Sequence, residues 1–590
     1  MRRPSANSKW SAYLGLIAVL CVFCAPLFVG LGNWDLRSDE AIYSYAVDRI
    51  LETGDWLTPR SIPRDGPFIE KPPLKFWMVA GAIRAGLLPH DEFGLRFMDA
   101  LFGAVAFVYV FWLGRRLAGS VCGFVAVLVL FTIDPLLFEH GLRSNNMEAA
   151  LVLSYCGGVY HFARWADDHS TRRPSIHALA VAAYFTLGFM TKFVAVLFLP
   201  LVCAVALAWR RDALLRIRSN WHDWVVPVLL AVAVSAPWFV YQAMQANSDF
   251  WQIMFGLHVY TRFTGAVDPA HLQPWHYYYS QLWAQLTVAG SQWIAAIGML
   301  VLAVTGWTGR PWLARLVFVW GVVPVALMSV GTSKLFHYAY PFLPPIALGV
   351  GAVAAALFRA IESRMAPIAG AAERGLSQAM ERTLAHRWPV AARRFRSLTW
   401  ATSEYPSRAR SLARQLLVAG AVAATLMAGT GSLRNPVSAY PLTLGRLTSV
   451  SRPLRALVDC AVTGRPAGTH VYPTYERLPS HLPYYYLRQV GPWVEHDGSP
   501  KNDELLLRLY APGQQTLVIL SMDDYQDFTQ QVALGEVRAV PPPDSRSIGL
   551  ALSEDIVLLT PWPFEVCAAI AVTTAGGQGI GDFSKWKTRP

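Results

Sequence analysis

Long apolar runs constrain the fold of this chain more than any other feature. Runs such as 13–31, 124–131 and 225–240 consist almost entirely of aliphatic, aromatic and small residues. A helix of about 20 apolar residues crosses the hydrocarbon core of a bilayer. Of the 590 residues, 54% are hydrophobic and 15% are charged, whereas soluble domains carry about 25% charged residues. We therefore expect a polytopic α-helical membrane protein.

The N-terminus suggests an orientation for the first span. Arg2 and Arg3 precede an apolar run that is longer than a signal-peptide core and lacks an A-x-A-like cleavage site. We interpret this run as an uncleaved anchor whose basic end lies in the cytoplasm. About eleven spans follow from the apolar runs: 11–32, 95–114, 119–138, 147–164, 175–191, 194–209, 224–244, 286–306, 313–331, 339–358 and 413–430.

The distribution of arginine supports this topology. Cytoplasmic loops of membrane proteins are enriched in Lys and Arg, and alternate predicted loops are basic here: 115–116, 172–173, 210–218 and 310–315. The segment 359–414, with eleven Arg and four Glu, predicts amphipathic helices on the anionic inner leaflet. The net charge of +12 therefore reflects topology and bilayer contact, and we expect no nucleic-acid partner.

Four regions follow from these spans. Residues 1–358 form a predicted transmembrane catalytic domain, whose outer loop 33–94 includes an interfacial helix at 72–88. A basic cytoplasmic segment, 359–412, precedes the last span, 413–430. Residues 431–590 predict an extracytoplasmic α/β domain, because strand-like runs at 469–472, 516–521 and 556–560 alternate with helical stretches such as 502–510.

The cysteines give little information about chemistry. Five of them, Cys21, Cys24, Cys122, Cys156 and Cys203, lie in apolar helices and are expected to be small core residues. Cys460 and Cys567 lie in the tail, and the sequence leaves open whether they pair. No Cys/His spacing indicates a metal site. We expect no required cofactor, and the sequence leaves dependence on a divalent metal open.

The polar groups of interest all fall on the predicted outer face, where ionisable residues near the membrane are costly and usually functional. They are the acids Asp39, Glu40, Glu70 and Glu148, the bases Arg60, Lys71, Lys192, Arg262 and Lys334, and a set of Tyr and His residues that includes Tyr43, His258, His337 and Tyr338. Carboxylates facing cations suit proton removal coupled to departure of an anionic leaving group. Lys and Arg bind phosphate oxygens. Because the outer face has no nucleotide supply, we expect a lipid-linked sugar as the donor.

Several motifs occur in a consistent order over about residues 10–358. They are Ser38-Asp-Glu-Ala-Ile-Tyr, Glu52-Thr-Gly-Asp-Trp, Glu70-Lys-Pro-Pro-Leu, Gly94-Leu-Arg-Phe-Met-Asp, Met190-Thr-Lys, Leu257-His-Val-Tyr-Thr-Arg-Phe, Gln273-Pro-Trp and Ser333-Lys-Leu-Phe-His-Tyr. This set resembles bacterial glycosyltransferases of the GT-C superfamily. The likeness is greatest to the 4-amino-4-deoxy-L-arabinose lipid A transferases and their protein mannosyltransferase relatives.

The resemblance implies roles for particular residues. Asp39 matches the acidic residue that activates the acceptor hydroxyl, and the adjacent Glu40 is a further catalytic candidate. Lys71, Arg262 and Tyr338 match positions that hold the lipid phosphate, with Glu70 supporting the lysine and Lys334 nearby. Glu148 stands where relatives usually carry a second aspartate. Tyr43, Arg60, Lys192 and His258 complete the expected substrate cavity.

Three departures from the family pattern leave the sugar and acceptor open. Ile42 stands where close relatives tend to carry Arg, the pair Phe68-Ile69 replaces an aromatic hydroxyl, and Leu257 replaces a glutamate. We expect an inner-membrane glycosyltransferase that moves a sugar, with inversion, from a polyprenyl-phosphate carrier to a periplasmic acceptor. A lipid A-like glycolipid, a polysaccharide and a protein all remain candidate acceptors.

Other interpretations of the same residues stay open at this point. Asp39 and Glu40 suit a helix N-terminus, and Glu70-Lys71 suits a local ion pair. Other polar groups also suit the membrane boundary: Lys192, Lys334, Arg96, Tyr338 and Tyr340. His258 and Arg262 also suit ordinary loop positions. At the level of function, the alternatives are a secondary transporter and a catalytically inactive envelope-assembly protein.

Overall fold

The structure is a computed structural model of the whole chain. It describes residues 6–37, 39–62, 66–167, 175–208, 214–215, 219, 221–265, 269–308, 312–364, 435–452, 455, 469–473, 485–486, 515–521, 548–551 and 556–560. The predicted last span 413–430, most of the basic segment 359–412, the tail helix 502–510 and both tail cysteines lie outside the described residues.

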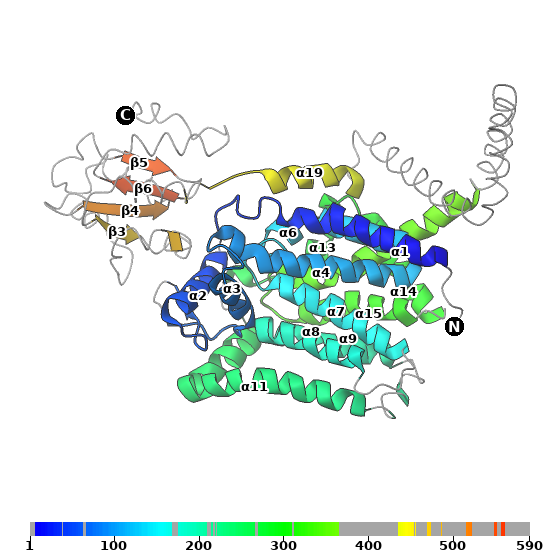
Figure 1. Cartoon of the computed structure of the whole chain (residues 1–590), viewed down its shortest axis with the longest axis horizontal. Helices are drawn as coiled ribbons and strands as arrows, with labels where there is room; N and C mark the ends of the chain where they lie inside the picture. Colours follow the sequence, from blue (N-terminus) through cyan, green and yellow to red (C-terminus); the bar gives the residue numbers. More distant parts are fainter. Residues whose placement is uncertain are drawn as a thin grey trace, which may run out of the picture.

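The body of the protein is a bundle of helices that run side by side along its long axis (Figure 1). The bundle helices are α1 (Ala6–Val19) with its continuations η1 (Leu20–Cys24) and η2 (Ala25–Phe28), α4 (Glu92–Ala118), α5 (Ser120–Phe131), α7 (Glu148–Asp167), α8 (Ile176–Lys192) with η3 (Phe193–Val196), α9 (Phe198–Leu207), α11 (His222–Trp251), α13 (Tyr277–Val288), α14 (Gln292–Thr308), α15 (Trp312–Val330) and the segment Phe336–Arg364, which begins with η6 (Phe336–Phe342).

The lengths and hydropathies of these helices agree with a membrane body. Five described helices are long and apolar enough to cross a bilayer: Glu92–Ala118, Ile176–Val196, His222–Gln245, Trp312–Val330 and Phe336–Arg364. Shorter apolar helices occur at Tyr13–Phe28, Ser120–Phe131, Phe198–Leu207 and Gln292–Thr308. The predicted helical membrane architecture is therefore confirmed at this level.

Small residues allow the helices to approach closely. A Cβ added to Gly114 of α4 would lie 2.5 Å from the Cα of Gly123 in α5, and one added to Gly298 of α14 would lie 2.3 Å from the carbonyl carbon of Gly349. Contacts of this kind are typical of packing between membrane helices, where dispersion and close backbone approach replace a hydrophobic driving force. Four of the five helical cysteines are buried as expected, whereas Cys21 is exposed.

The predicted outer loop 33–94 is an ordered cap at the end of the bundle opposite the N-terminus (Figure 1). It contains α2 (Asp39–Thr53), the two-stranded hairpin β1 (Arg60–Ser61) and β2 (Gly66–Pro67), and α3 (Leu74–Arg84). The expected helix at 72–88 thus exists. Helix α4 then begins where the carboxylate of Asp91 accepts a hydrogen bond from the amide of Gly94 at 3.0 Å, as an N-cap does.

The region 245–285, expected to be a loop, is largely helical. Helix α11 continues to Trp251 and is followed without a break by the π-helix η4 (Gln252–Thr261) and by α12 (Arg262–Thr264). A short turn, η5 (Pro269–His271), then leads to α13. On the other side of the site, α6 (Asp134–Phe138) is joined to α7 by residues 139–147.

The tail contains a four-stranded sheet with the order β3-β4-β6-β5. Its strands are β3 (Thr469–Pro473), β4 (Gln515–Ser521), β5 (Ile548–Ala551) and β6 (Ile556–Thr560), with β3 parallel to β4 and the other pairs antiparallel. Three of the four match strands expected from the sequence. Helix α19 (Pro436–Thr448) packs on the bundle instead, because Tyr440 donates to the carbonyl of Val22 at 2.8 Å and contacts the Phe131 ring.

Candidate active site

Five of the predicted site residues lie at helix ends or in the short helix η6. Asp39 is the first residue of α2 and Glu148 the first of α7, whereas Lys192 is the last of α8. Arg262 begins α12, and Tyr338 lies in η6. Acids at helix N-termini and a base at a C-terminus are each favoured by the helix dipole. Four charged groups and Tyr338 thus come from five segments, and Asp39, Glu148 and Lys192 occupy helix ends that favour their charges.

Lys71 occupies the centre of this group. Its ammonium interacts electrostatically with Glu70 and Asp39 and with the cations Lys192 and Arg262. The pKa of Lys71 is lowered to about 8: burial is the main cause, Lys192 and Arg262 add to the lowering, and Glu70 and Asp39 oppose it. A partly buried cation in this setting is poised to receive an anionic group.

A second chain of contacts links the remaining residues. The carboxylate of Glu148 forms an ion pair with the Lys192 ammonium, which lies 4.5 Å from the centroid of the Tyr338 ring. The hydroxyl of Tyr338 in turn accepts a hydrogen bond from Arg262 Nη1 at 2.5 Å. Glu148 is 4% exposed and Lys192 12%, so the pair is held away from water. These contacts fix the cations Lys192 and Arg262 relative to each other.

Tyr43 lies near the carboxylates of Asp39 and Glu148. Its buried ring packs against Phe68 and Phe76, with centroids 6.0 and 5.9 Å apart. Burial raises the pKa of Tyr43 well above its ordinary value, and the carboxylates Asp39 and Glu148 add to the effect. The hydroxyl therefore stays protonated and is available as a hydrogen-bond donor.

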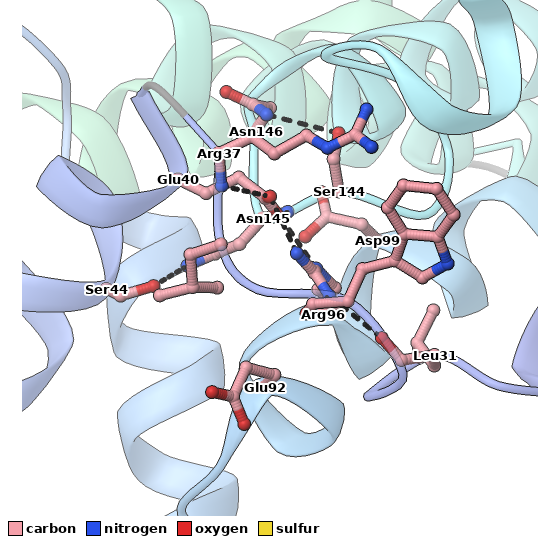
Figure 2. Close-up of polar contacts among 12 residues, drawn as sticks. Leu31, Arg37, Glu40, Ser44, Glu92, Arg96, Asp99, Ser144, Asn145 and Asn146 are labelled. Carbon is pink, nitrogen blue, oxygen red and sulfur yellow. Dashed lines mark hydrogen bonds and ion pairs between the residues drawn. The ribbon is translucent and has the colours of Figure 1, made fainter. Parts of the chain in front are cut away.

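Glu40, a catalytic candidate in the sequence, lies in a different environment (Figure 2). Its carboxylate forms a two-pronged ion pair with Arg96 at 2.7 and 2.8 Å. It also accepts hydrogen bonds from the backbone amides of Asn145, at 2.6 Å, and Arg37, at 2.9 Å. Burial alone would raise the pKa of Glu40, but Arg96 and the two amides outweigh it and hold that pKa below its ordinary value. Four hydrogen bonds from Arg96, Asn145 and Arg37 already occupy the Glu40 carboxylate. Glu40 is therefore better placed to support the site than to contact substrate.

The loop 139–147 is fixed to α2 and the bundle by further polar contacts. Asn145 donates its side-chain amide to Ser44 at 2.9 Å (Figure 2), and Arg143 donates to the carbonyl of Leu27 at 2.9 Å. Lys75 of α3 pairs with Asp99 of α4 at 2.8 Å, with neither side chain exposed, and also donates to the Asn146 carbonyl. Sequence reasoning missed this support, although charged residues inside apolar segments were a signal for it.

Three other candidates lie elsewhere. Lys334 donates to the carbonyls of Gln273, at 2.9 Å, and Gly331. These hydrogen bonds hold Lys334 close to the chain beside α12, and its role at the donor phosphate stays a prediction. Arg60 lies on β1, opposite Pro67. His258 lies in η4, and its side chain is outside the described part of the chain.

Two histidines join the site. The rings of His140, in loop 139–147, and His337, in η6, are stacked with centroids 4.4 Å apart and planes 15° apart. His140 Nδ1 lies 4.0 Å from Asp39 Oδ2, and His337 Nε2 lies 3.4 Å from Glu148 Oε1. His337 was among the expected outer-face residues, whereas no motif pointed to His140. Among the described residues, no three His, Cys, Asp or Glu side chains are grouped as metal ligands would be.

Sequence comparison identifies similar proteins. A family model described as dolichyl-phosphate-mannose-protein mannosyltransferase matches residues 70–241. An undecaprenyl phosphate-alpha-4-amino-4-deoxy-L-arabinose arabinosyl transferase from Pectobacterium atrosepticum is 26% identical over 368 residues, which are 62% of this chain and 62% of that protein. A second such transferase, from Pseudomonas fluorescens, is 28% identical over 58% of this chain and 59% of its own length. The chain thus spans about three fifths of these relatives.

Two solved structures share the fold. ArnT from Cupriavidus metallidurans, bound to undecaprenyl phosphate, superposes with a TM-score of 0.62 at 19% identity, over 95% of this chain and 99% of that one. The oligosaccharyltransferase AglB from Archaeoglobus fulgidus gives a TM-score of 0.50 at 11% identity, over 88% of this chain and 70% of that one. The chain therefore has the fold of these two proteins, and the resemblance indicated by its ordered motifs is confirmed.

Proposed function

We propose that this chain is a glycosyltransferase that moves one sugar from a polyprenyl-phosphate-linked donor to an extracytoplasmic acceptor. One observation carries the proposal: Lys71, from the cap, interacts with Asp39, Lys192 and Arg262 from three other segments. A cluster in which one carboxylate faces several cations provides a base on one side and receptors for an anion on the other. The arabinosyl transferases and the solved ArnT, whose names include undecaprenyl phosphate, support the choice of donor.

The proposed reaction is a single displacement with inversion at the anomeric carbon. Asp39 removes the proton from the acceptor hydroxyl while the acceptor oxygen forms a bond to that carbon. The bond between the anomeric carbon and the phosphate oxygen breaks, and its electron pair leaves with the polyprenyl phosphate. No step calls for a cofactor.

The cations of the cluster stabilise the leaving phosphate in this scheme. Lys71 and Arg262 offset the negative charge that develops on it, and Tyr338 fixes the Arg262 guanidinium through the 2.5 Å hydrogen bond. Glu70 supports Lys71. Glu148 orients Lys192 through their ion pair. Tyr43, which stays protonated, donates to oxygens of the bound sugar or phosphate.

We further infer that the enzyme lies in the bacterial inner membrane with its site at the periplasmic face. The cap of α2 and α3 lies at the end of the bundle opposite the N-terminus (Figure 1), and the predicted basic loops fall on the N-terminal side. With this topology the chain has about eleven spans, and the tail sheet belongs to an α/β domain in the periplasm. A lipid A-like glycolipid, a polysaccharide and a protein are the candidate acceptors.

The experiment that tests this function compares cells with and without the gene. Mass spectrometry of envelope lipids, polysaccharide and glycoproteins is expected to reveal one species that lacks a single sugar increment in the deletion strain. The species that changes also identifies the acceptor class. Restoring wild type should recover the increment and restoring Asp39→Asn should not. Identical envelope profiles in all strains would contradict the proposed transfer.

A further inference from the structure

The stacked imidazoles of His140 and His337 bridge the two carboxylates of the site. The His140 end faces Asp39, with Nδ1 4.0 Å from Oδ2, and the His337 end faces Glu148, with Nε2 3.4 Å from Oε1. The rings between them are nearly parallel and 4.4 Å apart. The stack thus connects Asp39 to the Glu148–Lys192 ion pair.

The two histidines are held in register by the segments that carry them. The hydroxyl of Tyr340 in η6 lies 2.9 Å from the carbonyl oxygen of Pro135 and 2.7 Å from that of Glu139, the residue before His140. The same turn of η6 carries Tyr338, which accepts from Arg262. The stack is therefore fixed to the groups assigned to the donor phosphate.

The backbone of His140 supports a functional reading. Its φ is +54°, in the left-handed region that is uncommon for residues other than Gly, although His, like Asn and Asp, adopts it more often than most. Such conformations persist where surrounding structure enforces them, and they cluster at functional sites. Asn145, a few residues along the same loop, anchors it to Ser44 of α2. The loop thus holds His140 beside the first turn of α2.

We propose that His140 and His337 act together as positioning residues that hold the base Asp39 at a fixed place relative to the donor phosphate. This inference rests on the proposed function. Asp39 is 41% exposed, so its side chain needs an external contact to restrict its orientation. Correct placement of reacting groups is worth a large rate factor, and a displacement of about 1 Å costs on the order of 100-fold.

The charges around the stack are consistent with this role. The stack faces Asp39 and Glu148, and Lys192 and Arg262 also act on His337. Glu148 is held by its ion pair with Lys192, so the His337 end of the stack lies beside a fixed carboxylate, whereas the His140 end faces the carboxylate of Asp39.

The test separates ring stacking from other roles of the two residues. His140→Asn suits the positive φ and keeps an amide donor but removes the ring. His337→Phe keeps a ring for stacking but removes the nitrogen that faces Glu148, whereas His337→Ala removes both. For each purified variant, kcat and the KM for an undecaprenyl-phosphate-linked sugar are measured. His161→Ala is the matched control, since His161 contacts His177 in a pair outside the site.

We expect His140→Asn and His337→Ala to lower kcat at least tenfold with the donor KM within about twofold of wild type, because Lys71 and Arg262 are intact. His337→Phe should keep kcat within about threefold, as should His161→Ala. Wild-type kcat in His140→Asn, or equal losses in His337→Phe and His337→Ala, would overturn the inference. Absence of sugar transfer by wild type would instead contradict the proposed function itself.

Discussion

At the scale of single residues, the site depends on which ionisable groups are held charged. Lys71 and Glu40 both belong to the cap, yet burial determines the direction in which the pKa of Lys71 shifts, whereas ion pairing and hydrogen bonds determine that of Glu40. Lys71 loses affinity for its proton because desolvation and two cations outweigh Glu70 and Asp39. Glu40 keeps its charge because Arg96 and two backbone amides compensate for burial. The first is equipped to bind a ligand anion and the second to support the fold.

Donor capture should therefore depend on pH through Lys71. With a pKa of about 8, the ammonium is charged below pH 8 and becomes neutral above it, where its attraction for phosphate is lost. We expect kcat/KM for the lipid donor, which reports the free enzyme, to fall about fivefold between pH 8 and pH 9.

Lys71→Arg provides the matched variant, because a guanidinium stays charged throughout this range. Its kcat/KM should be lower at pH 7, where the geometry differs, but should not decline between pH 8 and pH 9. The measurement is the pH profile of kcat/KM for the lipid donor in detergent, with Lys71→Ala as the variant that lacks the cation. Superimposable alkaline limbs for wild type and Lys71→Arg would exclude Lys71 as the titrating group.

At the scale of elements, the cap is attached to the bundle by buried polar contacts. Glu40 of α2 joins Arg96 of α4 and the loop 139–147 (Figure 2), and Lys75 of α3 joins Asp99 of α4. Because both partners are buried, loss of one leaves an uncompensated charge. Because these contacts position the cap over the site, a substitution that removes one of them should lower both the stability of the cap and the activity.

Glu40→Gln tests the attachment directly. Removing this charge should cost about 3–5 kcal/mol of stability, because the Arg96 guanidinium stays buried without a counter-ion. Glu52→Gln is the control: Glu52 pairs with Arg49 at an exposed position on the same helix, where ion pairs contribute at most about 1 kcal/mol. Thermal unfolding in detergent provides the measurement. Similar midpoints for the two variants would refute a structural role for Glu40.

Close helix packing leads to another prediction at this scale. In Gly298→Ala, the new Cβ would lie 2.3 Å from the carbonyl carbon of Gly349, so α14 must move away, at a cost of about 1–3 kcal/mol. In Gly81→Ala, on α3, the new Cβ meets nothing within 4 Å, and the higher helix propensity of Ala should stabilise by up to about 1 kcal/mol. Opposite shifts in the unfolding midpoint are expected, and equal shifts would contradict this packing.

At the scale of the whole molecule, the sequence predicts the architecture better than the contacts. Apolar runs of bilayer length identify the membrane helices, and the ordered motifs identify Asp39, Lys71, Arg262 and Tyr338. Both signals are local, so they need no knowledge of helix packing. Pairings such as Lys75 with Asp99 depend on the register between two helices, which a single sequence does not encode in any local pattern.

The same limit applies to the surroundings of individual site candidates. Glu40 and Asp39 are neighbours in the sequence, but the helical rotation of about 100° per residue directs one towards Arg96 and the other towards His140. The motif Ser333-Lys-Leu-Phe-His-Tyr puts Lys334 among the candidates for the phosphate site, but it does not reveal that the Lys334 ammonium donates to the carbonyl of Gln273. Only the tertiary structure distinguishes these roles.

We propose that residues from five segments form one site in which Asp39 is the base. Steady-state sugar transfer by purified Asp39→Asn, with donor binding followed in parallel, tests this proposal. We expect a loss in kcat of about 100-fold or more with the donor KM unchanged, since Lys71 and Arg262 are intact. Transfer by Asp39→Asn at the wild-type kcat would contradict it.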